Sequence, residues 1–339
     1  MNPSAWSNSS AEPADPMYWL SAPLSAAVVL GNLLLVVGIA GNHRLHRSTD
    51  WHFLSLATAG LGVGVVLPSV PAMSFPSQYP RQICFFFHLF PNFLFLAFLG
   101  SLGVVQAHRY ACVVHPLRYS SSWLCRSVSP GLLLAWLPAL FYCSLPALGW
   151  HRWGTHTPPT GGRCHFSLIF PPAYIYLEIY GLLVPGILAV TGMAVRVLCV
   201  ARGQIRSIAR LHRAVASTST AAEQQQMSVR HSRCVLAFAL MVLLCWLPYI
   251  LYIHVSLVAA VRHRGPSRTQ SVLTCLGTSS AALIPVGLGL GNRRYTHLWG
   301  RLVPGLSPYH VIETSNSTSP DIRSSQLHTA MSYQQPWSE

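Results

Sequence analysis

Long apolar stretches separated by short polar segments run through most of this chain. A helix needs roughly 20 predominantly apolar residues to cross the hydrocarbon core of a bilayer. Seven stretches are about that long or longer, and they occupy residues 23–40, 53–73, 83–112, 130–148, 170–199, 234–260 and 272–291. The pattern predicts an all-α membrane protein built as a seven-transmembrane-helix bundle.

The same pattern predicts the domain organisation. Residues 1–20 precede the spans and form the N-terminal segment, and residues 21–291 form the transmembrane domain. Residues 292–304 carry apolar side chains at helical spacing, which predicts a short amphipathic eighth helix on the inner leaflet. Residues 305–339 are rich in Ser, Thr and Pro, and we expect a disordered cytoplasmic tail there.

Composition supports the membrane class. The chain is 51% hydrophobic and only 9% charged, whereas a soluble domain carries about 25% charged residues. Its nine cysteines form no CxxC pair, so neither a zinc framework nor a small disulfide scaffold is indicated.

The charge is one-sided, with a formal net charge of +14 and basic residues that are all arginine. With the N-terminus outside, 16 of the 22 arginines fall in cytoplasmic segments, which is the bias that orients membrane proteins. The positive charge therefore indicates topology, and no nucleic-acid partner is expected. A plasma membrane location with the N-terminus outside makes Asn8 of the Asn-Ser-Ser motif a glycosylation acceptor.

Several markers recur at fixed depths in the spans. Arg109 ends the third span, and Cys84 lies 25 residues before it, which is about 37 Å along a helix and the depth of a bilayer. Trp136 and Pro185 mark the fourth and fifth spans, and Cys-Trp-Leu-Pro at 245–248 marks the sixth. In this order the set resembles the rhodopsin-like G-protein-coupled receptors along nearly the whole chain.

The resemblance implies roles at both ends of the bundle. At the outer end it implies a disulfide between Cys84 and Cys164, which would tie the loop after the fourth span over the bundle. At the inner end Arg109 is expected to act as a switch that meets a heterotrimeric G protein. The predicted coupling residues are Arg109, Tyr110, His115 and Pro116.

Three further stretches resemble the bile acid receptors within that family: SLPALGW at 144–150, IFPPAYIYLEIYGLLVP at 169–185 and IPVGLGLGNRRYTHLW at 284–299. This resemblance implies that a bile acid or related steroid binds outside and that a stimulatory G protein raises cAMP inside. Membrane lipid surrounds such a receptor. The Ser/Thr-rich tail offers sites that, once phosphorylated, arrestin could bind.

The chain departs from the general family at three places. Gly60 stands where most members have an aspartate, and residues 284–288 lack the usual Asn and Tyr, so we expect no buried sodium site. His108 precedes Arg109 where an acid is usual. Without that acid we hypothesise a weakly restrained resting state, since about 1.4 kcal/mol changes a population tenfold. The alternative is that His108 is a neutral bystander.

Candidate ligand contacts lie in the outer half of the spans. His88, Asn92 and Phe95 share one face of the third helix. Glu178 is the only acid inside any span, and a carboxylate there is costly enough to indicate function. The polar groups would bond a steroid's hydroxyls. The aromatic side chains expected to bury its apolar face are Phe93, Phe95, Trp246, Tyr249 and Tyr252. The full predicted set is His88, Asn92, Phe95, Glu178, Trp246, Tyr249, Ser256 and Thr278.

Six of these residues also have a purely structural interpretation. Asn92 can join helices, Phe95 and Tyr249 can pack, and Glu178 can face lipid headgroups. Ser256 and Thr278 can bond their own helix backbone, as hydroxyl side chains in membrane helices usually do.

Other function classes are less favoured by the sequence. The spans contain no histidine cluster with metal-ligand spacing and no paired nucleophile and base, so we expect no catalytic, metal or cofactor site. A receptor for another steroid or lipid stays open as the alternative function. A transporter is less favoured because transporters usually carry internal repeats, and none is visible.

Overall fold

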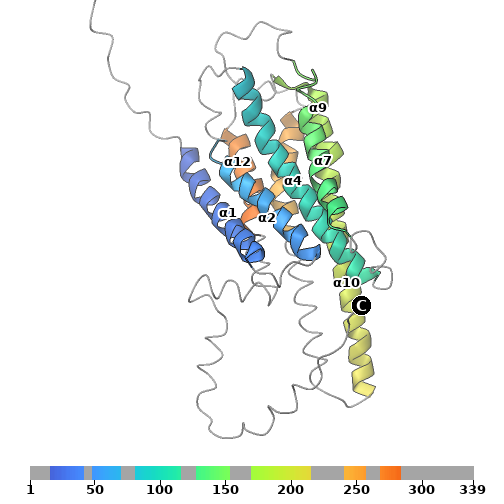
Figure 1. Cartoon of the computed structure of the whole chain (residues 1–339). Helices are drawn as coiled ribbons and strands as arrows, with labels where there is room; N and C mark the ends of the chain where they lie inside the picture. Colours follow the sequence, from blue (N-terminus) through green and yellow to red (C-terminus); the bar gives the residue numbers. More distant parts are fainter. Residues whose placement is uncertain are drawn as a thin grey trace, which may run out of the picture. The chain divides into compact units, whose positions relative to one another are not determined.

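The structure is a computed structural model, and it describes residues 16–41, 48–69, 81–115, 127–152, 169–214, 240–256 and 268–283. Within these ranges the regular elements are helices, shown in Figure 1. They are α1 (Pro16–Ala40), α2 (Ser48–Val66), α4 (Arg81–Val114), α7 (Ser129–Ser144), α9 (Pro172–Tyr176), the π-helical η2 (Leu177–Leu183), α10 (Val184–Ala214), the helix Leu240–Ser256 and α12 (Arg268–Thr278).

Every predicted span contains a helix, because α9, η2 and α10 follow one another without a break and together form the fifth. Three described segments are long and apolar enough to cross a membrane: Trp19–Ala40, Phe85–Val114 and Pro172–Gly203. Ser129–Ser144 and Leu240–Ser256 are shorter apolar helices. The predicted eighth helix and tail lie outside the described residues.

The helix bounds differ from the predicted spans in three places. α1 begins at Pro16, inside the segment assigned to the N-terminus. α2 ends at Val66, well before residue 73, because Pro68 disfavours helical backbone in the residue before it. α10 continues to Ala214, beyond the apolar part of the fifth span, and Arg202 and Arg206 are exposed on that extension.

α4 is the central helix of the described part. It contacts α2, α7 and α10, whereas α1 contacts α2 and α12. Pro91 lies inside α4 without ending it, which membrane helices tolerate when neighbouring groups satisfy the freed carbonyl. Side chains on the inward faces of α4 therefore meet several other helices.

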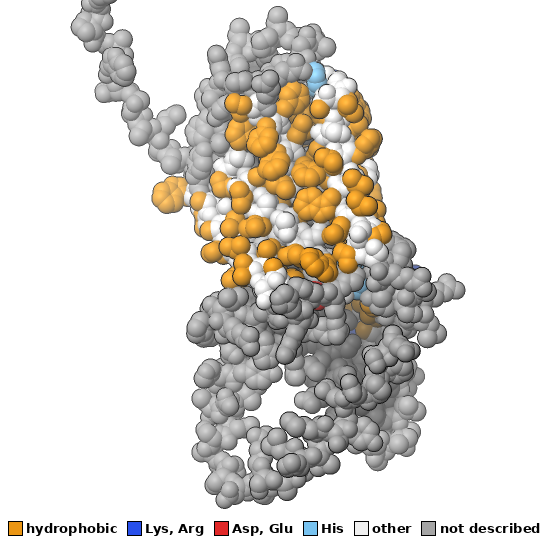
Figure 2. Space-filling view, in the orientation of Figure 1, with side chains coloured by type: hydrophobic (Ala, Val, Ile, Leu, Met, Phe, Trp, Pro, Cys, Tyr) orange, Lys and Arg blue, Asp and Glu red, His pale blue; other side chains and the backbone are white. Residues whose placement is uncertain are grey.

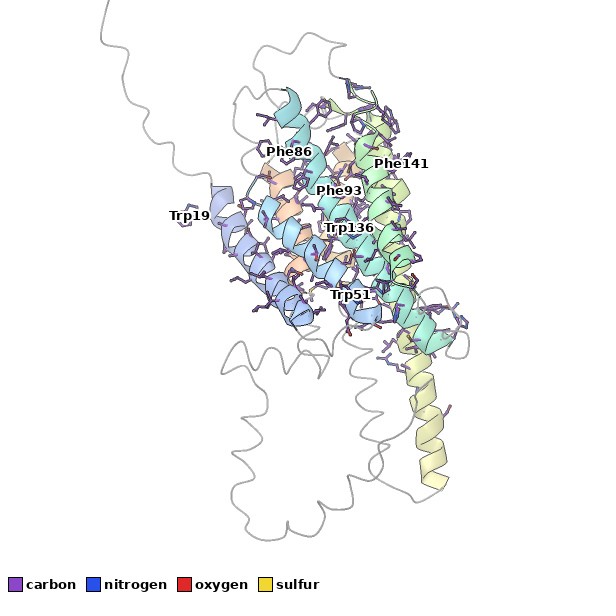
Figure 3. The ribbon with its side chains drawn as sticks, in the orientation of Figure 1. Trp19, Trp51, Phe86, Phe93, Trp136 and Phe141 are labelled. Carbon is purple, nitrogen blue, oxygen red and sulfur yellow. The ribbon has the colours of Figure 1, made fainter. Side chains whose placement is uncertain are left out.

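The outward faces of the helices are apolar. On α7, Leu133, Leu137 and Phe141 are each more than half exposed and follow one another at four-residue spacing. Figure 2 shows apolar side chains spread over the visible face of the helical part, and Trp19 and Phe141 are labelled on outward positions in Figure 3. Such surfaces are stable in lipid and unfavourable in water.

Polar side chains join the helices inside. The indole of Trp136 in α7 donates to the hydroxyl of Ser55 in α2 at 2.9 Å, and Ser55 lies 3.1 Å from the hydroxyl of Ser101 in α4. Asn32 of α1 donates to the carbonyl of Ala281 at 3.2 Å. Interhelical hydrogen bonds of this kind help membrane helices to associate, because lipid gives no hydrophobic driving force between them.

Candidate functional site

The three predicted residues on α4 contact three different elements. His88 packs edge-on against Phe170, with ring centroids 6.1 Å apart. Asn92 donates a hydrogen bond to Glu178 in η2, and Phe95 lies against Trp246, 4.0 Å away between centroids. This face of α4 therefore links the segment before α9, the π-helical turn and the helix Leu240–Ser256.

Phe93 has a different environment from Phe95. Its ring lies 5.8 Å from that of Trp136 in α7, and Figure 3 labels both residues between α4 and α7. The sequence grouped Phe93 with the aromatics expected around a ligand beside Trp246. The structure instead places it at the contact with α7, because residues two apart on a helix point to different sides.

Glu178 sits within the π-helical turn and is partly exposed. Its Oε2 atom lies 3.1 Å from the hydroxyl of Tyr142 in α7, and Asn92 donates to the same carboxyl group. Donors from two neighbouring helices thus meet this acid, and its side chain does not extend alone into lipid. π-helical turns inside longer helices frequently occur at functional sites.

Tyr142 belongs to an aromatic column. Its ring stacks on that of Tyr174, with centroids 4.4 Å apart and planes 15° apart. Phe170 stacks on Tyr174 in turn at 5.1 Å, and Phe170 touches His88 of α4. The column connects α7, the start of the fifth helix and the outer part of α4.

Trp246 forms the other aromatic cluster. It is 4% exposed, and Tyr249 meets it edge-on at 5.6 Å. A Cβ atom built on Gly277 of α12 would lie 2.7 Å from Cε2 of the indole. Only a glycine allows α12 to approach Trp246 this closely.

The remaining predicted ligand residues lie on the last two described helices. A side-chain hydrogen bond joins Tyr249 to Gln270 of α12. Thr278 is 7% exposed and donates to the carbonyl of Thr274 at 2.9 Å, as the structural interpretation of this residue anticipates. Ser256 is partly exposed at the end of its helix.

The inner end of α4 carries the predicted coupling residues. The guanidinium of Arg109 lies over the ring of Phe53 at 5.2 Å, and Tyr110 meets His115 edge-on at 5.8 Å. His108 is 2% exposed and turns toward α2, where its Nε2 atom lies 3.4 Å from the hydroxyl of Thr49. Its ring centroid is 5.7 Å from that of His52.

Several predicted residues, or their side chains, lie outside the described part of the chain. Cys84 lies in the first turns of α4, but its side chain is outside the described part. Cys164, Asn8 and Pro116 also lie outside the described residues. Among the described side chains, no group of three or more His, Cys, Asp or Glu could hold a metal ion.

Sequence reasoning missed four residues that shape this site: Tyr142, Tyr174, Gln270 and Gly277. All four act through contacts between helices, and no spacing within one helix indicates them. A weak signal existed for Tyr142 and Tyr174, because the first residue adjoins and the second lies within stretches that resemble the bile acid receptors, 144–150 and 169–185.

Comparison with known proteins gives consistent matches. The chain matches the family model described as 7 transmembrane receptor (rhodopsin family) over residues 31–286. It is 38% identical to the bovine G-protein coupled bile acid receptor 1 over 335 residues, which is 93% of this chain and 98% of that protein. The human protein of the same name is 39% identical over 283 residues, covering 83% of this chain and 82% of that protein. The mouse 5-hydroxytryptamine receptor 6 is 26% identical over 316 residues, covering 84% and 71%.

Proposed function

Because the chain belongs to the rhodopsin family of seven-transmembrane receptors, we propose that it is a cell-surface receptor that binds bile acids and activates a stimulatory G protein, raising cAMP. Proteins of this family are multi-pass membrane receptors and not enzymes. The observation that carries the bile acid assignment is the 38–39% identity to bile acid receptors over most of the chain.

The ligand site that we propose lies among α4, η2, the helix Leu240–Ser256 and α12. A bile acid has an apolar steroid face, ring hydroxyls and an anionic tail. The rings of Phe95, Trp246 and Tyr249 would cover the apolar face, at roughly 25 cal/mol per Å² of apolar surface removed from water. Asn92 and Glu178 would bond the hydroxyls, and His88, Ser256 and Thr278 complete the proposed set.

The G-protein site that we propose lies at the inner end of α4, with the N-terminus outside the cell. Arg109 and Tyr110 would contact the G protein with His115 and Pro116. The basic extension of α10, where Arg202 and Arg206 are exposed, supports this orientation because arginine concentrates on the cytoplasmic side. The Cys84–Cys164 disulfide, glycosylation at Asn8, the helix at 292–304 and arrestin binding to the tail belong to the same proposal.

The test is a cAMP dose–response in cells, using a panel of free and conjugated bile acids. The cAMP response of wild-type receptor should saturate with bile acid concentration. Asn92→Ala and Tyr249→Ala should each lower the potency about tenfold, the size of one or two lost hydrogen bonds. Tyr176→Ala is the matched control, because Tyr176 is 36% exposed and stacks on Tyr180. Silence to every bile acid, with a response to another steroid or lipid, would overturn the ligand assignment.

A second measurement separates a receptor from a transporter. Labelled bile acid should bind saturably, and more tightly when G protein is present. Accumulation of label inside vesicles without any effect of G protein would instead indicate transport.

A further inference from the structure

Two buried tyrosines join α7 to the start of the fifth helix by reciprocal hydrogen bonds. The hydroxyl of Tyr142 lies 3.1 Å from the backbone carbonyl of Tyr174, and the hydroxyl of Tyr174 lies 3.4 Å from the backbone carbonyl of Tyr142. Both residues are at most 2% exposed, and their rings stack. The two helices are therefore fixed relative to one another at this level.

The same Tyr142 hydroxyl lies 3.1 Å from Oε2 of Glu178. A hydroxyl has one proton, so the Tyr174 carbonyl and the Glu178 carboxyl group share the hydrogen of Tyr142 as acceptors. Glu178 follows Tyr174 by four residues, so the tyrosine pair holds the backbone just before the acid while one of its hydroxyls holds the acid itself.

The carboxyl group keeps acceptor capacity for a ligand. An ionised carboxylate has two oxygens with about four acceptor positions. Asn92 and Tyr142 donate to it from opposite neighbours, α4 and α7. These two partners leave acceptor positions on the carboxylate that a ligand donor can use.

We propose that Tyr142 positions Glu178 and thereby sets a preference for ligands that present a hydroxyl, and not a ketone, to this carboxyl group. The inference rests on the proposed function, because it takes Glu178 to face a steroid with ring oxygens. With Glu178 ionised, a ring hydroxyl donates to the carboxylate. A ketone only accepts, so its oxygen would oppose the carboxylate oxygens without a hydrogen bond.

The decisive variant is Tyr142→Phe. It removes the hydroxyl that reaches Glu178, together with its bond to the Tyr174 carbonyl, and keeps the ring that stacks on Tyr174. The selectivity ratio below distinguishes the loss at Glu178 from a general loosening of the two helices. Tyr176→Phe is the matched control, because the ring of Tyr176 stacks on Tyr180 on the outward side of the fifth helix.

The first experiment measures selectivity. Each ring hydroxyl of a bile acid is oxidised in turn to the ketone, and the potency ratio of each pair is measured by cAMP. Wild type should favour the hydroxyl at one ring position, and Tyr142→Phe should reduce that ratio about tenfold, whereas Tyr176→Phe should keep it. An unchanged ratio in Tyr142→Phe overturns the proposal, even if overall potency falls, since a packing role would weaken both ligands equally. Wild type without a preference at any position also overturns it.

The second experiment needs no ligand. Infrared difference spectra between purified wild-type receptor and Glu178→Gln isolate the carboxyl band of Glu178. The same difference taken in a Tyr142→Phe background should show a shifted band, and in a Tyr176→Phe background an unshifted one. If no bile acid activates wild type, the proposed function is wrong. This spectrum still decides whether Tyr142 positions Glu178, because it is recorded without ligand. A band that stays in place in Tyr142→Phe overturns that positioning.

Discussion

The ring of Phe95 in α4 lies against the indole of Trp246, with centroids 4.0 Å apart and planes 32° apart. Gly277 of α12 approaches the same indole so closely that a Cβ there would lie 2.7 Å from it. Trp246 is thus held between two helices, and its position depends on a large ring on one helix and on the absence of a side chain on another.

Gly277→Ala should therefore destabilise the receptor. A methyl group forced into a packed contact costs typically 1–3 kcal/mol, or about 2, which exceeds the gain of up to about 1 kcal/mol from replacing glycine in a helix. The measurement is the thermal unfolding midpoint of purified receptor in detergent. Gly192→Ala in α10 is the control, because a Cβ there meets nothing within 4 Å, and it should be neutral or stabilising. Equal midpoints for Gly277→Ala and wild type would contradict the prediction.

The hydrogen bond from Trp136 to Ser55 should contribute measurable coupling between α7 and α2. Trp136→Phe and Ser55→Ala should each lower the free energy of unfolding, and the double variant should lose less than the sum of the two. Interhelical bonds in membranes average about 0.6 kcal/mol, so the coupling energy should be of that size. A double-mutant cycle by denaturant titration measures it, with Phe141→Leu on the exposed face as control. Strict additivity would show that the bond contributes nothing.

Agonist affinity should not depend on sodium. Gly60 carries no carboxylate, and the amide of Asn32 fills the space beside it, since a Cβ on Gly60 would lie 2.7 Å from Asn32 Oδ1. The measurement is agonist binding in sodium chloride and in an equal concentration of N-methylglucamine chloride. A lower affinity in sodium alone would mean that a cation site exists despite this substitution.

The sequence predicted where helices lie because membrane insertion depends on local apolar length, and three described segments are long and apolar enough to cross a membrane. All seven predicted spans contain a helix. The predicted helix ends were least accurate where charge or proline acts, at Val66 before Pro68 and along the basic extension of α10. Those ends depend on backbone sterics and on solvation outside the lipid, which an apolar count does not measure.

The candidate site was predictable only in part. Glu178 stands out in the sequence because an acid inside a span is rare. Its hydrogen bonds to Asn92 and Tyr142 depend on how α4 and α7 pack around η2. A π-helical turn has no sequence signature of its own, so neither its place nor the partners that it brings together could be derived from spacing.

His108→Glu should lower ligand-independent cAMP. His108 is buried and turned toward Thr49 and His52 of α2, while the adjacent Arg109 lies over Phe53 of the same helix. A carboxylate introduced at position 108 enters a poorly solvated site beside a guanidinium, and the attraction between them should favour the resting state. A gain of about 1.4 kcal/mol would reduce the active population tenfold.

The comparison that isolates charge is His108→Gln, which keeps a neutral side chain able to bond Thr49 and should leave basal cAMP near the wild-type level. Basal cAMP must be compared at equal surface expression, and the maximal response to agonist should survive in both variants because neither touches the proposed ligand site. If His108→Glu and wild type signal equally without ligand, the histidine is a bystander. If His108→Gln falls as far as His108→Glu, the buried imidazole itself sustains the active state, and the missing acid before Arg109 is not the cause.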